Sequence, residues 1–176
     1  MRLFTAIDLP AEMVEKLSVF LARLRPLAKL RWTEIENLHI TTKFIGEWPE
    51  ARLDEVKNAL RGVPRTEAIT ISVRAIGWYP DLRRPHVFWA GVDGGEPLQK
   101  LARMTEEAVA TLGVPAEPRA YSPHLTLARV RYAVPLDDLI KAAGDPDFGA
   151  FQASSFFLYL SLNGKYSKLV EFPLNS

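Results

Sequence analysis

One short pattern occurs in both halves of this sequence. A histidine is followed two residues later by a threonine within an apolar run, first at His39 and Thr41 and again at His124 and Thr126. The chain contains three histidines, so chance is a poor explanation for finding two of them in the same pattern. The repetition predicts two similar structural units that each present the same pair of side chains.

Each repeat has the spacing of a β-strand. Successive side chains of a strand point to opposite faces, so the histidine and the threonine of each pair share one face. The residue between them, Ile40 in the first repeat and Leu125 in the second, is then expected in the core. A strand packed in this way holds its polar side chains on a rigid support.

Periodicity elsewhere in the chain predicts further helices and strands. The expected helices cover residues 13–24, 53–60, 98–112 and 136–143. The expected strands cover residues 2–8, 38–45, 69–73, 87–92, 151–162 and 168–172, with one more at the second repeat. Each half therefore runs histidine strand, helix, strand, strand.

This shared order predicts the fold class and the domain organisation. We expect an α+β fold, with two pseudo-symmetric lobes built from mostly antiparallel sheets flanked by helices. The whole chain, residues 1–176, is expected to form one bilobal domain. Under that symmetry the two histidine strands face each other across a cleft between the lobes.

Two imidazoles that meet in such a cleft suit proton transfer. Histidine titrates near neutral pH, so one ring can accept a proton while the other donates one. Threonine hydroxyls beside them can donate hydrogen bonds to an oxyanion. An acid, a base and several donors predict in-line displacement at phosphorus, such as the opening of a cyclic phosphate.

With these motifs, the chain resembles the two-histidine (2H) phosphoesterase superfamily. Within it the chain is similar to the RNA 2′,3′-cyclic phosphodiesterases, a branch first described as 2′-5′ RNA ligases. The segments that carry the resemblance are residues 2–10, 32–46, 123–129 and 164–173. The resemblance implies the same bilobal fold, no cofactor and no metal.

The resemblance also implies a reaction and a role for each histidine. An RNA terminal 2′,3′-cyclic phosphate is hydrolysed to a 2′-phosphate end, with His39 as proton donor and His124 as proton acceptor. Spacing alone allows either order of these two roles. The reverse reaction, with a 5′-hydroxyl in place of water, joins RNA ends through a 2′-5′ link. The expected partners are RNA ends or short oligonucleotides that carry the cyclic phosphate.

Two basic residues near the repeats are candidates for binding the phosphate. Arg129 lies five residues after His124, so strict alternation turns it away from the histidine face, and a bulge would restore it. The resemblance associates a basic residue at this position with the phosphate site. Lys43 lies four residues after His39, so strict alternation places it on the same face as the histidine. It is either a second candidate for binding the phosphate or a solvated strand residue.

Aromatic residues near the repeats are candidates for stacking on a nucleobase, although most aromatic residues lie in cores. The candidates are Phe4, Trp32, Tyr121 and Tyr166. Lys165 and Lys168 either add positive potential at the rim of the cleft or keep the tail soluble. The third histidine, His86, lacks the repeated pattern and is expected to be structural.

Composition narrows the functional classes further. The chain has no cysteine, which excludes disulfides, thiolate catalysis and cysteine-ligated zinc and fits a reducing cytoplasm. The apolar stretch before Asp8 is too short for a signal peptide, and no later run is long enough to span a bilayer. We therefore expect a cytoplasmic monomer without membrane contact. The net charge of +1 indicates that contact with RNA is local, at a chain end.

Three alternatives stay open on the sequence. The chain is also compatible with a 2H phosphodiesterase that acts on another cyclic or 2′-5′ nucleotide. A non-catalytic nucleotide-binding module would retain the cleft. Loss of either histidine would then change no reaction rate, because the module catalyses no reaction. A metal site formed by the two histidines is the weakest alternative, because threonine is a poor partner ligand and no cluster of acidic residues accompanies the motifs.

Overall fold

The computed structural model of the chain describes residues 1–175 and places two antiparallel sheets at its centre. The four-stranded sheet has the order β3 (Ile40–Glu47), β1 (Arg2–Ile7), β8 (Ser155–Leu162) and β9 (Lys165–Pro173). The five-stranded sheet has the order β2 (Arg31–Trp32), β6 (His124–Arg129), β5 (Val87–Asp93), β4 (Ile69–Tyr79) and β7 (Asp147–Ala153).

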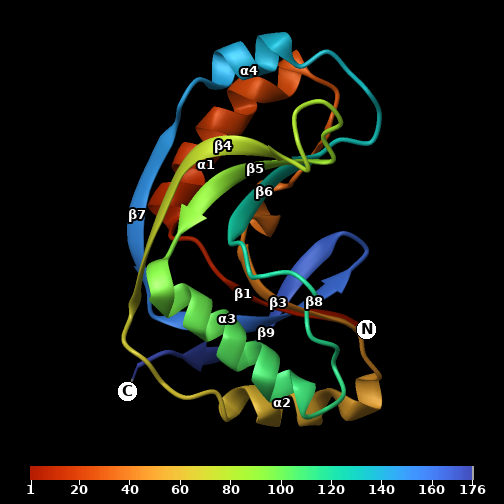
Figure 1. Cartoon of the computed structure of the whole chain (residues 1–176), viewed down its shortest axis with the longest axis vertical. Helices are drawn as coiled ribbons and strands as arrows, with labels where there is room; N and C mark the ends of the chain where they lie inside the picture. The colour runs from red at the N-terminus through yellow and green to blue at the C-terminus, as the bar shows by residue number, and fades with distance from the viewer. Residues whose placement is uncertain (176) are drawn as a thin grey trace.

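Four α-helices flank these sheets in the part of the chain that the structure describes. They are α1 (Ala11–Leu24), α2 (Leu53–Arg61), α3 (Gly95–Ala110) and α4 (Asp137–Ala143), with short 3-10 turns at Arg25–Leu27, Ile35–Asn37 and Glu50–Arg52. Helices α1 and α4 pack together beside β7, whereas α2 packs on α3, which contacts β3 (Figure 1). The expected α+β fold with two antiparallel sheets flanked by helices is confirmed. None of the helices described is long and apolar enough to cross a membrane.

The two halves of the sequence exchange strands between the sheets. Strand β3 of the first half pairs into the sheet that contains β8 and β9 of the second half. Strand β6 of the second half joins β4 and β5 of the first. Each lobe is therefore assembled from both halves, and its histidine strand comes from the half that does not supply the hairpin of the same sheet.

One expected strand is two strands in the structure. Residues 151–162 are expected to form a single strand, yet the chain leaves one sheet after Ala153 and enters the other at Ser155. The break lies at Ser154, whose carbonyl accepts a hydrogen bond from the backbone of Leu174. The buried positions shift by three residues across the break, from Ala153 to Phe156, because the two strands belong to different sheets, so two-residue alternation does not run through residues 151–162.

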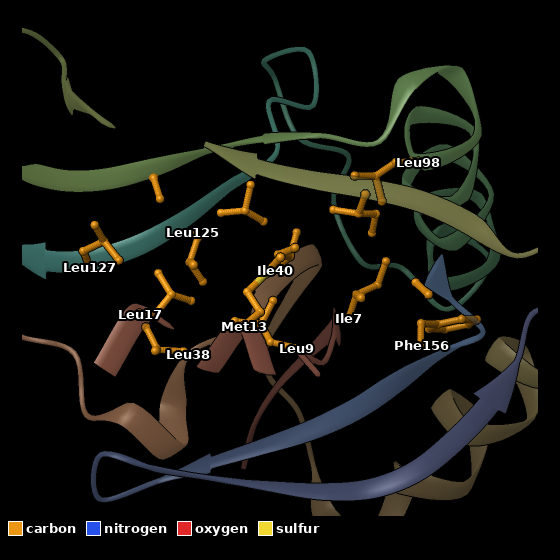
Figure 2. Close-up of a cluster of buried hydrophobic side chains, with 14 of the residues drawn as sticks. Ile7, Leu9, Met13, Leu17, Leu38, Ile40, Leu98, Leu125, Leu127 and Phe156 are labelled. Atoms are coloured by element: carbon orange, nitrogen blue, oxygen red, sulfur yellow. The ribbon is translucent and has the colours of Figure 1, made fainter. Parts of the chain in front are cut away.

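The buried core includes the residue that lies between the histidine and the threonine of each motif. Ile40 and Leu125 are both fully buried, as the strand spacing predicts. Figure 2 shows them in one cluster with Leu17 and Met13 of α1. Strands β3 and β6 also contact each other, which brings the two histidine motifs close together in the structure.

Candidate active site

The two histidines are anchored in the same way. Nδ1 of His39 lies 2.6 Å from the carbonyl oxygen of Asn37, and Nδ1 of His124 lies 3.0 Å from that of Ser122. A carbonyl only accepts, so each Nδ1 carries a proton and donates it, which makes Nε2 the unprotonated nitrogen of the neutral ring. The carbonyl two residues upstream thus fixes ring orientation and tautomer in both repeats.

The threonines lie on the histidine faces, as predicted. Nε2 of His39 is 2.8 Å from Oγ1 of Thr41, which donates to it when the ring is neutral. Thr126 pairs with Trp89 on β5, two residues from the pairing of His124 with Gly91, so it shares the face of His124. Each half therefore contributes a matched imidazole and hydroxyl.

A β-bulge follows each motif, at the same distance from the histidine. On β3 the pairing with β1 skips Thr42, and on β6 the pairing with β5 skips Leu127. A bulge inserts one residue and reverses the facing of every residue beyond it. Strict alternation therefore holds only up to the threonine.

The second bulge restores Arg129 to the histidine face. Arg129 pairs with Val87, which is two residues from Trp89, the partner of Thr126. Its guanidinium is exposed on the side of the sheet that carries His124. A planar, permanently charged donor at this position is suited to phosphate oxygens.

The first bulge removes Lys43 from that face and corrects both expectations for it. The side chain of Lys43 is 1% exposed, and its Nζ donates to Glu106 at 3.2 Å and to the Pro115 carbonyl at 2.9 Å. It therefore lies on the face opposite Thr41 and is shielded from solvent. Glu106 in turn accepts a hydrogen bond from the backbone of Glu117, so Lys43 ties β3 to the loop that leads to His124.

Phe44 occupies the position in the first motif that Arg129 occupies in the second. It pairs with Phe4 on the face of Thr41, and its side chain is 58% exposed. The sequence analysis missed it, although its spacing of five residues from the histidine equals that of Arg129. An exposed aromatic ring beside the histidine provides a surface for a nucleobase.

Phe4 packs against the ring of His39 and is too deeply buried to stack on a base. The side chain of Phe4 is 4% exposed, and its ring centroid lies 4.9 Å from that of His39. It stacks on Tyr159 and meets Tyr166 edge to face. Tyr166 also meets His39 edge to face at 5.2 Å, so three aromatic rings enclose this imidazole.

The turn near the tail is held against the first motif. The side chain of Asn37 donates to the carbonyl of Gly164 at 2.7 Å and accepts from the backbone of Tyr166 at 3.3 Å. Lys165 is exposed, whereas Lys168 pairs with Asp8 and lies over Phe157.

Two further aromatic candidates are engaged in packing. Trp32 pairs with Ala128, on the face opposite Arg129, where it packs on Phe88 and donates from Nε1 to the Ala28 carbonyl. Trp32 therefore faces away from the histidine side of the sheet, and the expectation that it stacks on a base is wrong. Tyr121 is half-buried, and its hydroxyl donates to the Thr41 carbonyl at 2.7 Å.

Trp89 is an aromatic residue on the face of His124 that the sequence analysis missed. It is half-buried opposite Thr126, and its ring lies against Gly77 of β4. A Cβ atom at Gly77 would be 2.1 Å from that ring, so glycine is required for the tryptophan to lie flat on the sheet. The sequence shows a tryptophan in one expected strand and a glycine before it, but only the pairing of β4 with β5 shows that the two face each other.

His86 is exposed and hydrogen-bonds through its backbone. Its N–H donates to the Tyr79 carbonyl, and its own carbonyl accepts from Val130. These bonds close the hairpin of β4 and β5 onto the end of β6.

The environment of His39 lowers its pKa below the ordinary value of 6.5. Burial is the largest cause, and the positive charge of His124 acts in the same direction. The hydrogen bond to the Asn37 carbonyl and the negative charge of Asp8 oppose them. The influence of His124 places the two imidazoles within electrostatic reach of each other.

We expect an NMR titration of the ring C–H protons to show a midpoint for His39 below 6.5. In His124→Gln the midpoint should rise, because a neighbouring positive charge is removed. In Asp8→Asn it should fall, because a negative charge is removed. A midpoint at or above 6.5 in the intact protein, or a shift of opposite sign in either variant, would contradict this electrostatic picture.

Comparison with known proteins gives concordant matches in sequence and in structure. A family model described as LigT like phosphoesterase matches residues 7–89 and 92–165. An RNA 2′,3′-cyclic phosphodiesterase of Methanocaldococcus jannaschii is 35% identical over 164 residues, which cover 92% of this chain and 91% of that protein. Another from Archaeoglobus fulgidus is 31% identical and covers 92% of both.

Solved structures match over nearly the whole chain. Escherichia coli LigT complexed with 3′-AMP has a TM-score of 0.81 at 30% identity and covers 99% of this chain and 98% of its own. A protein of Thermus thermophilus has a TM-score of 0.83 at 27% identity, with the same coverage. The similarity in sequence and fold thus extends well beyond the two motifs.

Proposed function

This chain belongs to the LigT-like phosphoesterase family, and from that premise we propose that it hydrolyses an RNA terminal 2′,3′-cyclic phosphate to a 2′-phosphate end. The observation that carries the proposal is the matched anchoring of His39 and His124. Each ring is held by an upstream carbonyl in the tautomer whose Nε2 is the nitrogen that gains and loses a proton.

The reaction begins with His39 protonated and His124 neutral. Nε2 of His124 takes a proton from water as the water oxygen attacks phosphorus, opposite the 3′ oxygen. The bond from phosphorus to the 3′ oxygen breaks, and Nε2 of His39 protonates the departing oxygen. The phosphate stays on the 2′ oxygen, and exchange with solvent returns both histidines to their starting states.

The remaining polar groups of the cleft stabilise the charge on phosphorus. The hydroxyls of Thr41 and Thr126 and the guanidinium of Arg129 donate to the non-bridging oxygens. A bound phosphodiester also raises the pKa of His39, because a negative charge beside an imidazole favours its charged form. The substrate thereby counteracts the burial that lowers the pKa of His39 in the free protein.

The same groups catalyse ligation when an RNA 5′-hydroxyl replaces water. His124 then takes the proton of that hydroxyl, and the product is a 2′-5′ phosphodiester. Hydrolysis and ligation share one site and one assignment of roles.

Replacement of Arg129 by alanine is expected to lower kcat/KM for a short cyclic-phosphate RNA by about 10²–10³-fold, the usual loss when a donor to a developing oxyanion is removed. Because the side chain is exposed, the melting temperature should hardly change. Arg129→Lys should recover part of the rate, since the charge returns without the planar fork.

The matched control for this prediction is Arg61→Ala, which removes an exposed arginine from α2. It should leave the rate unchanged. Full activity of Arg129→Ala would remove this residue from the site.

The experiment that tests the function is hydrolysis of a short RNA ending in a 2′,3′-cyclic phosphate, with a metal chelator present and with the product end identified. We expect turnover that the chelator does not reduce, with a 2′-phosphate as product. A 3′-phosphate product would contradict the assignment of the leaving oxygen. Loss of activity in chelator would contradict metal independence.

The same assay distinguishes the alternative functions. A 2H phosphodiesterase with another substrate would leave the RNA intact and cleave a 2′-5′ dinucleotide or another cyclic nucleotide. A binding module would retain the nucleotide in equilibrium dialysis and cleave none of these. Either result from folded protein would overturn the proposed reaction.

A further inference from the structure

A groove of about 510 Å³ lies beyond the end of the histidine strand β6. One wall is the loop between β4 and β5, and the other is the loop that follows β6 (Figure 1). Its lining includes Leu82, Arg83, Arg84, His86, Arg131 and Tyr132. None of them belongs to the catalytic group described above.

The groove concentrates positive charge. Arg83, Arg84 and Arg131 are exposed, and within the described residues none of them lies within 4.0 Å of a carboxylate. The one carboxylate among the lining residues is Asp137. Since the whole chain has a net charge of only +1, this cluster is a local feature of the surface.

The loop that carries two of these arginines is ordered by its own hydrogen bonds. Oδ1 of Asp81 accepts from the backbone N–H groups of Arg83 and Arg84, at 2.8 and 3.1 Å. These bonds shape the turn and use backbone donors, so both guanidinium groups are available to a ligand.

The groove begins one residue beyond Arg129, where Val130 enters its lining. Arg129 at the end of β6 pairs with Val87, and the next residue, Val130, donates to the His86 carbonyl at 2.8 Å. From His124 to Arg131 the chain advances roughly 20 Å at strand spacing. A stacked nucleic-acid strand advances about 3.4 Å per nucleotide, so this length corresponds to about six nucleotides.

We propose that this groove binds the sugar-phosphate backbone of the RNA several nucleotides upstream of the end that enters the cleft. The inference rests on the proposed function, because the cleft must hold the RNA terminus. Arg83, Arg84 and Arg131 contact phosphates. Tyr132, which is 79% exposed, and Leu82, which is 50% exposed, provide surfaces for unpaired bases. The enzyme thereby favours longer RNA over short oligonucleotides.

The test compares two RNAs by fluorescence anisotropy. Both end in a non-hydrolysable 3′-phosphate, one with about twelve nucleotides and one with about three, so that only the longer one reaches the groove. The variant R83Q/R84Q/R131Q removes three charges from the groove. The control K57Q/R61Q/R65Q removes the same number around α2, at the opposite end of the molecule (Figure 1).

We expect the groove variant to bind the longer RNA roughly tenfold more weakly than the intact protein, as three exposed charge contacts allow. The slope of log Kd against log salt concentration should be smaller by about 2 in this variant, since each phosphate contact on a single strand contributes about 0.7 to the slope. Binding of the short RNA should be unchanged, and the control should behave as the intact protein does.

A groove variant that binds the longer RNA as well as the control does would overturn the proposal, and so would an equal loss for both RNA lengths. Because the readout is binding, it is separate from the test of the reaction. An intact protein that binds the longer RNA through the groove but hydrolyses no cyclic phosphate would contradict the proposed function alone.

Discussion

Alanine at His39 or at His124 is expected to lower kcat/KM for cyclic-phosphate hydrolysis by about 10²–10⁴-fold, the usual contribution of a positioned general acid or base. Each substitution removes one of two proton transfers that occur in the same displacement. The double variant should lose little more than the worse single variant, because groups that act as a unit are not additive. Steady-state rates on a short RNA measure all three.

The matched control is His86→Ala, the third histidine of the chain, which is exposed and lies outside the cleft. Its rate on the short substrate should equal that of the intact protein. Thermal unfolding should establish that all variants are folded. A rate in either single variant close to that of the intact protein would exclude that residue from proton transfer.

A modified substrate separates the two roles. When sulfur replaces the 3′ oxygen, the leaving thiolate needs little protonation, because a thiol has a pKa near about 8.5. His39→Ala should then recover most of its lost rate, whereas His124→Ala should stay slow. Recovery in His124→Ala alone would assign the roles in the opposite order.

Lys43→Met is expected to destabilise the protein by about 2 kcal/mol, the cost of leaving the Pro115 carbonyl unpaired and Glu106 without its cation. The side chain is buried, while Glu106 is partly exposed, which keeps the loss below that of a fully buried pair. For a chain of this size the change corresponds to a drop in melting temperature of roughly 4–8 °C.

The same variant should reduce activity without touching the substrate. Lys43 and the hydroxyl of Tyr121 both fasten the loop before His124 to the strand that follows His39. Loosening that loop changes how the two imidazoles face each other, so kcat should fall more than KM rises. Lys141→Met, on the exposed surface of α4, is the control for loss of a lysine charge. An unchanged melting temperature in Lys43→Met would contradict the conclusion that Lys43 holds this loop against β3.

The strand pattern of each motif was sufficient to predict its local geometry. Alternation placed Ile40 and Leu125 in the core and each threonine on the face of its histidine, and the structure agrees. This succeeded because two-residue periodicity is a property of the extended backbone itself and needs no information about distant parts of the chain. The resemblance carried by the same segments led to the correct family.

Beyond each threonine, the tertiary pairing decides which way a side chain faces. Lys43 and Arg129 exchange their expected faces because a bulge follows each motif, and a bulge depends on the neighbouring strand. The aromatic candidates failed for a related reason. Phe4 and Trp32 are recognisable as aromatic residues in the sequence, but only the packing around them decides whether a ring supports the site or faces a ligand.

The sequence by itself determined the paired histidines, the residues beneath them and the α+β class, since all three follow from local periodicity and side-chain chemistry. The tertiary structure alone decided that each sheet takes its histidine strand from one half of the chain and its hairpin from the other. It also placed the two loops that form the arginine-lined groove side by side. These features depend on contacts between residues far apart in the chain, and such contacts leave no periodic signal in a single sequence.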